Sequence, residues 1–102
     1  MSFKKQVLKT KDVCKATFTL TQKEVKNAST VHIVGDFNNW NETATPLKKF
    51  KNGNFKTTIN LVKGEKYQFK YIVDSSNWIN DEKADLYIPN NFSGENSVII
   101  AE

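Results

Sequence analysis

The sequence predicts an all-β protein, specifically an antiparallel β-sandwich. Two observations predict this fold class: apolar and polar residues alternate in several short stretches, and turn-forming residues separate these stretches at near-regular spacing. No stretch has the periodicity of an amphipathic helix. With 102 residues, the chain is long enough for one core and too short for two. We therefore expect one domain over residues 12–102, preceded by a basic, flexible lead-in over residues 1–11.

In the first half of the domain, two strands and an edge segment are predicted. Ala16, Phe18 and Leu20 alternate with polar residues, as in a half-buried strand. Residues 30–35 are rich in β-branched side chains and form the next predicted strand. Pro46 then indicates a short edge segment, because proline cannot donate a hydrogen bond to a central ladder.

In the second half, a hairpin signal is followed by two alternating stretches. Asn52-Gly53 favours a tight turn between antiparallel strands. Residues 55–62 alternate after it, and residues 67–74 place Tyr67, Phe69, Tyr71 and Val73 on one face, which we expect to lie in the core. Residues 80–95 have little periodicity, and residues 97–101 supply the last predicted strand.

Charge and cysteine content narrow the classes of partner and compartment. The net charge of +4 comes from 15 basic residues, all of them lysine. The lack of arginine argues against a nucleic-acid partner, since arginine is preferred for bidentate phosphate and base recognition. Cys14 is alone, so no internal disulfide is expected. No signal peptide or membrane-spanning run is recognisable, so we expect a cytoplasmic protein that does not bind membranes.

Two tryptophans follow predicted strands, in turns where a core residue is not required. Trp40 ends the run Val34-Gly35-Asp36-Phe37-Asn38-Asn39-Trp40, and Trp78 follows the turn at residues 74–77. Lys70 lies on the face opposite the aromatic stripe and should point outward. If the strands are neighbours, both indoles and this lysine converge on a surface suited to a sugar, whose C–H groups pack on aromatic rings. The alternative is that one or both indoles are core residues.

Catalytic and metal-binding chemistry is not indicated. Asp74, Asp81, Glu82 and Asp85 lie in polar turns, where solvated carboxylates are expected rather than the opposed pair of a glycosidase. The sole histidine, His32, has no neighbouring nucleophile in the sequence pattern. We therefore expect neither an enzyme nor a metal or other cofactor.

Four motifs in order resemble carbohydrate-binding module family 48, which includes the glycogen-binding domain of the AMP-activated protein kinase β subunit and the early-set domains of isoamylases and branching enzymes. They are residues 34–40, the strand at 67–74, Trp78 and residues 96–100. The resemblance implies an immunoglobulin-like β-sandwich that binds α-1,4-glucans such as glycogen or starch without cleaving them. It implies stacking by Trp40 and Trp78 and hydrogen bonds from Lys70 and Asn96. Phe92 and Gly94 hold the places of a leucine and a threonine in the kinase-subunit domains.

Three functions remain open at this point. The first is a non-catalytic module that binds α-glucans, through Trp40, Lys70, Trp78, Phe92 and Asn96. The second is a protein-interaction domain that docks a glycogen- or starch-active enzyme. The third, binding of single-stranded nucleic acid, depends on aromatic residues interleaved with lysines and predicts steep salt dependence.

Overall fold

The computed structural model describes residues 2–9, 11–90 and 94–102, which form two antiparallel sheets packed as a sandwich. This confirms the predicted fold class. The described elements are nine strands and one short 3-10 helix: β1 (Ser2–Val7), β2 (Val13–Leu20), β3 (Val31–Gly35), η1 (Asp36–Asn38), β4 (Lys48–Lys49), β5 (Phe55–Val62), β6 (Lys66–Val73), β7 (Asn77–Ile79), β8 (Leu86–Pro89) and β9 (Glu95–Ile100).

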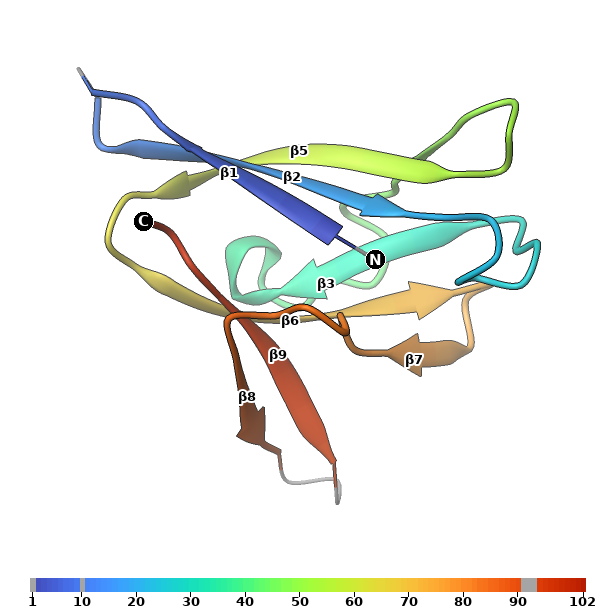
Figure 1. The fold of residues 1–102 in the computed structure, drawn as a ribbon. Coiled ribbons are helices and arrows are strands. Elements are labelled where there is room, and N and C mark those ends of the chain that lie inside the picture. The colour runs from blue at the N-terminus through green and yellow to red at the C-terminus, as the bar shows by residue number, and fades with distance from the viewer. Residues whose placement is uncertain (1, 10, 91–93) are drawn as a thin grey trace.

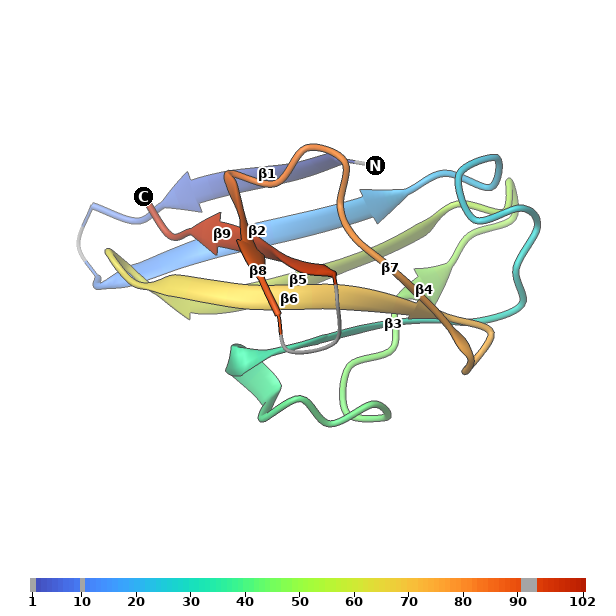
Figure 2. The same ribbon diagram turned by 90° about the horizontal axis from the view of Figure 1, so that it is seen from below.

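The two sheets have different strand orders. The strand order is β1-β2-β5-β4 in sheet A and β3-β6-β9-β8 in sheet B. β7 also pairs with β6, along the part of β6 that does not pair with β9. Figure 1 shows β1, β2 and β5 lying above β3, β6 and β7. The β8–β9 hairpin projects beyond the two layers in that view, and Figure 2 shows β8 crossing in front of β6.

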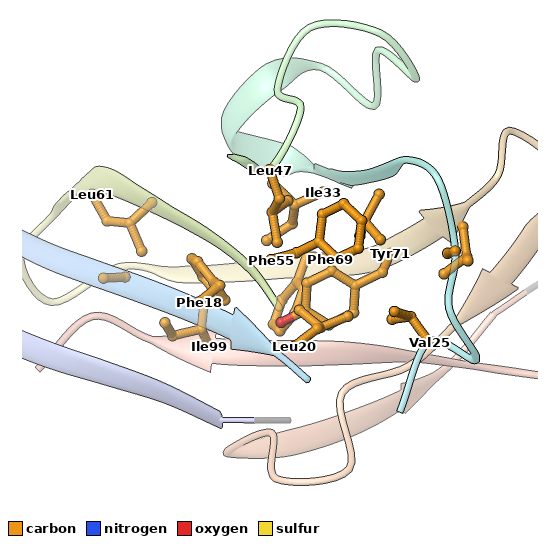
Figure 3. Close-up of a cluster of buried hydrophobic side chains, with 14 of the residues drawn as sticks. Phe18, Leu20, Val25, Ile33, Leu47, Phe55, Leu61, Phe69, Tyr71 and Ile99 are labelled. Atoms are coloured by element: carbon orange, nitrogen blue, oxygen red, sulfur yellow. The ribbon is translucent and has the colours of Figure 1, made fainter. Parts of the chain in front are cut away.

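The core lies between the sheets and is built from the predicted alternation. Cys14, Ala16, Phe18 and Leu20 face inward from β2, and the inward residues of β6 meet them from the other sheet. Figure 3 shows Phe18, Phe69 and Tyr71 among the buried side chains. The Phe69 ring contacts both of the others in edge-to-face geometry, with centroids 5.4 and 5.7 Å apart. Of the residues predicted on this face of β6, Tyr67 is only partly buried.

Residues Ser2–Val7 differ from the expected flexible lead-in, because they form β1 along the edge of sheet A. The strand pairs with β2 over its whole length, from Ser2 opposite Thr19 to Val7 opposite Cys14. Phe3 and Val7 pack against the core, and Phe3 lies 5.8 Å from Phe18 between ring centroids. These two apolar side chains anchor the segment, although two lysines stand between them.

Asp81 also differs from expectation, since its side chain is fully buried rather than solvated. Its Oδ2 accepts a hydrogen bond from the Tyr71 hydroxyl (2.7 Å), and its Oδ1 accepts one from the Lys83 amide (2.8 Å). Its own amide donates to Ser97 Oγ (2.9 Å). These partners replace the water that the carboxylate loses on burial, which is the condition for burying such a group.

The Tyr71–Asp81 pair predicts a loss of stability at alkaline pH. Burial raises the pKa of Tyr71 well above its ordinary value of 10.0, and the adjacent Asp81 raises it further. The native state therefore keeps a proton that the unfolded chain releases, so stability falls as pH rises above 10. Tyr71→Phe should cost about 1–3 kcal/mol at neutral pH, because Asp81 loses a donor. Above pH 10 its stability should fall less steeply than that of the wild type.

Urea unfolding at neutral and alkaline pH measures this difference. The buried Cys14 thiol, whose pKa is also raised mainly by burial, is present in both proteins and cancels in the comparison. Equal slopes above pH 10 would contradict the assignment to Tyr71.

Candidate functional site

The loop that follows β3 forms the first side of the site, and hydrogen bonds of the Asn38 side chain hold this loop in place. The Asn38 side chain accepts a hydrogen bond from the Gly35 amide and donates to Ile33 O and Thr45 Oγ1, each at 3.0 Å. The chain then turns sharply, because Asn39 and Trp40 both have a φ of 57°. Tryptophan rarely has a left-handed backbone conformation, and such conformations persist where surrounding contacts impose them. Here the Trp40 amide donates to Gly35 O (2.9 Å).

Asp36 fixes the orientation of the Trp40 ring. Its Oδ1 accepts the indole Nε1–H at 2.9 Å, and its Oδ2 accepts the Gln68 amide of β6 at 2.7 Å. The carboxylate therefore links the loop to the neighbouring strand through two charge-assisted hydrogen bonds. With the polar edge of the indole bonded to Asp36 at the protein surface, the Trp40 ring is held in one orientation and is partly exposed.

Lys70 and Trp78 come from the neighbouring strands β6 and β7. Trp78 lies opposite Ile72 in the ladder, and Lys70 is two residues before Ile72, so all three are on the outward face of sheet B. Trp78 is 41% exposed, which excludes the core alternative for this residue. Lys70 Nζ donates to Glu95 O at 3.0 Å, so its amine is held at the start of β9.

A chain of hydrogen bonds connects Glu95 O with the interior of the protein. Asn80 Nδ2 donates to the same carbonyl (2.9 Å), and Asn80 Oδ1 accepts from the Ser97 hydroxyl (2.9 Å). Ser97 in turn receives the Asp81 amide described above. The carbonyl that holds Lys70 is thus connected to the buried Tyr71–Asp81 pair.

Asn96 belongs to a second group of side-chain amides, on the β8–β9 hairpin. Its Nδ2 donates to Gln68 Oε1, and its Oδ1 accepts from Asn90 Nδ2, both at 3.1 Å. Asn90 also accepts the Gly94 amide through its Oδ1 (3.1 Å). The Asn96 and Gln68 amide groups have further donor or acceptor positions beyond these bonds. The predicted contact from Phe92 lies outside the described residues.

These segments enclose a surface pocket of about 560 Å³ on the outward face of sheet B. Its lining includes four of the five predicted site residues, Trp40, Lys70, Trp78 and Asn96, together with Asn90 and Gly94. Sequence reasoning missed Asn90 and also Asp36, which orients Trp40. Asp36 lies in the motif of residues 34–40 but was read there as a turn residue, and Asn90 lies in a polar stretch with little periodicity.

The outward face of sheet B also carries apolar side chains. Val34, Ile72 and Val98 are buried although they alternate with core residues, so they do not belong to the main core cluster. Ile88 lies opposite Asn96 in the β8–β9 ladder and is 38% exposed. The outward face of sheet B therefore carries buried aliphatic side chains next in register to Lys70 and Trp78, and an exposed one opposite Asn96.

The chemistry of the pocket lining is aromatic and amide, with one amine. Among the described lining residues, Lys70 is the sole charged side chain and no carboxyl group is present. The described residues contain no group of three or more His, Cys, Asp or Glu side chains placed to hold a metal ion. No helix in the described part of the chain has the length and apolar character needed to cross a membrane.

Comparison with known proteins agrees with this chemistry. The family model described as the glycogen recognition site of AMP-activated protein kinase matches residues 17–100. The chain therefore belongs to this family of glycogen-recognition domains. A curated relative, the 1,4-alpha-glucan branching enzyme GlgB of Butyrivibrio fibrisolvens, is 36% identical over 61 residues, which are 60% of this chain and 10% of that enzyme. The chain thus spans about a tenth of the length of this relative.

Proposed function

We propose that this chain is a non-catalytic module that binds α-1,4-linked glucans such as glycogen or starch. The observation that carries the proposal is the convergence of Trp40, Lys70, Trp78 and Asn96, from four separate segments, on one pocket. Sugar rings would stack on the two indoles, while the lysine and the amides would hydrogen-bond the hydroxyls.

The absence of cleavage chemistry in the pocket supports a binding role. Glycoside hydrolysis uses two carboxyl groups on opposite sides of the scissile bond. No described lining residue supplies even one. The Asp36 carboxylate near Trp40 is already occupied by the indole and by the Gln68 amide.

Titration of the ¹⁵N-labelled protein with maltoheptaose, monitored residue by residue, tests the proposal. We expect the indole resonances of Trp40 and Trp78 and the side-chain amides of Asn90 and Asn96 to shift together along one binding curve. The affinity should be modest, because the pocket is open to water and sugar hydroxyls exchange one set of hydrogen bonds for another. It should also depend little on salt, unlike nucleic-acid binding. Unchanged spectra at millimolar sugar would refute the proposal.

Asp36 provides a further prediction, because it positions Trp40 without lining the pocket. Asp36→Ala frees the indole to rotate, so binding must then order it. Ordering one such side chain costs about 0.5–1.5 kcal/mol, which corresponds to roughly twofold to tenfold weaker maltoheptaose binding. Asp36→Asn retains an oxygen acceptor for the indole, so its maltoheptaose affinity should lie between those of the wild type and Asp36→Ala.

The Trp40 Nε1–H resonance separates this positioning role from a general structural role. We expect it to move in Asp36→Ala without sugar, while the core methyl resonances stay in place. Wild-type affinity in that variant would show that Asp36 does not orient the ring for binding.

A second candidate function is docking of a glycogen- or starch-active enzyme. It is favoured by the relative, in which the matching segment makes up about a tenth of a branching enzyme. In this role Trp40→Ala/Trp78→Ala would leave partner binding unchanged, and maltoheptaose would produce no shifts.

A further inference from the structure

The strands of sheet A carry positive charge with no negative charge among them. β1, β2, β4 and β5 contain six lysines and no aspartate or glutamate. Two of these lysines have polar partners in the molecule: Lys5 forms an ion pair with Asp85 (3.0 Å), and Lys49 donates to Ala28 O (3.1 Å). The other four are exposed on the outward face of sheet A, and we call them the lysine face: Lys4, Lys15, Lys48 and Lys56. Lys48 Nζ lies 5.6 Å from the centroid of the exposed Phe50 ring, which leaves its charge facing solvent.

The register places these lysines close enough to repel one another. Lys48 lies directly opposite Lys56 in the β4–β5 ladder, and like charges in that relation are destabilising. Lys4 lies opposite Thr17, so it is a diagonal neighbour of Lys15, at about 7–8 Å on a regular sheet. Both separations fall within the screening length at physiological salt, about 8 Å. No ion pair or hydrogen bond with another described residue offsets the charge of Lys4, Lys15 or Lys56.

Protection of sheet edges explains only part of this arrangement. Natural sheets place lysines on edge strands to prevent pairing with other chains, and this accounts for Lys4 on β1 and Lys48 on β4. Lys15 and Lys56 lie on β2 and β5, which are central strands of sheet A. Their charges protect no edge, so edge protection does not account for them.

We propose that the lysine face docks an acidic surface of a partner protein. It is broad, and Gln6, Thr17, Thr58 and Asn60 supply neutral hydrogen-bonding groups between the lysines, with the two threonine hydroxyls 3.0 Å apart. Carboxylates are the complement of such a surface, since they accept from ammonium, hydroxyl and amide donors alike. The upper layer in Figure 1 carries this face, and the pocket opens on the outward side of the lower layer. A partner and a ligand in the pocket would therefore not compete.

Other anionic partners fit this face less well. Single-stranded nucleic acid is bound by successive stacking aromatics, whereas no aromatic ring projects outward from these four strands in the described structure. The exposed ring of Phe50, beside Lys48, is a single aromatic at one edge of the face. Duplex recognition uses elements that enter a groove, and bidentate contacts from arginine, which this chain lacks. Membrane surfaces are bound by faces with a large apolar component, and here the outward apolar side chains are Val13 and Val62, together at one end.

The test measures binding of the intact chain to fluorescein-labelled poly-L-glutamate by anisotropy at low salt. Lys15→Glu/Lys56→Glu should weaken this binding by roughly tenfold or more, because attraction becomes repulsion at two central positions. Lys23→Glu/Lys83→Glu makes the same change in net charge outside sheet A and should change affinity by about twofold at most. Excess maltoheptaose should leave the affinity unchanged.

Each alternative result overturns the proposal. If poly-L-glutamate does not bind, the lysine face is not a docking surface for acidic partners. If both double variants lose affinity equally, binding depends on net charge and not on the lysine face. Competition by maltoheptaose would place the probe at Lys70 instead. Tighter binding of oligothymidylate, or of vesicles of phosphatidylcholine and phosphatidylserine, with the same sensitivity to Lys15→Glu/Lys56→Glu, would assign the face to those ligands. If charge reversal unfolds the chain, Lys15→Gln/Lys56→Gln replaces it in the test. This neutral variant should bind poly-L-glutamate more weakly than the wild type, with a smaller loss than charge reversal would cause. Maltoheptaose titration of each variant reports on the proposed glucan function separately.

Discussion

Phe69→Ala is expected to destabilise the fold by about 3–5 kcal/mol. Phe69 is fully buried and stands at the centre of an aromatic cluster that joins the sheets. Its ring meets Phe18 of β2 and Phe3 of β1 across the interface, and Tyr71 on its own strand. Alanine would leave a cavity bounded by three rings, which cannot all move inward without breaking their edge-to-face contacts. For a domain whose total stability is about 5–15 kcal/mol, this loss is a large share.

Chemical denaturation measures the effect, with two variants as controls. Phe69→Leu keeps most of the apolar volume and should lose much less stability than the alanine variant. Phe50→Ala removes the same side chain at a position that is 41% exposed, and its effect should stay within about 0.5 kcal/mol. A loss below about 1 kcal/mol for Phe69→Ala would mean that the cluster closes around the cavity and does not hold the sheets together.

The strands with strict alternation were predictable from sequence, because period-two patterns directly encode one buried face. Phe18 and Leu20 on β2, and Phe69 and Tyr71 on β6, are all buried as expected. Three strands were missed, β1, β7 and β8, and all have weaker patterns. Lys5 interrupts the inward face of β1, β7 has only three residues, and β8 exposes all four of its residues, so none produces a clean apolar stripe.

The candidate site was predictable in its residue types but not in its assembly. Trp40 and Trp78 stand 38 residues apart, and their convergence depends on β3 and β7 lying on opposite sides of β6. Strand pairing of this kind is a long-range property that local periodicity does not contain. Asp81 shows the same limit: its place in a polar turn predicted solvation, whereas the fold brings Tyr71 and Ser97 to it and buries it.

Trp78→Ala is expected to weaken maltoheptaose binding by roughly thirtyfold or more, about 2 kcal/mol, while leaving the fold intact. Trp78 supplies the more exposed of the two indoles, and an exposed ring contributes little to packing. Its removal opens one wall of the pocket and deletes the proposed stacking surface, which alanine cannot replace. Trp78→Phe keeps an aromatic face and should retain much of the affinity.

Calorimetric titration together with thermal unfolding tests both halves of this expectation. Phe50→Ala is the matched control, because Phe50 has the same exposed fraction as Trp78, 41%, and lies outside the pocket. It should bind maltoheptaose like the wild type. If Trp78→Ala unfolds the domain, the indole contributes to packing, and if it binds normally, the ring is not a sugar platform. The proposed function depends on the remaining outcome, in which binding is lost and the unfolding midpoint is unchanged.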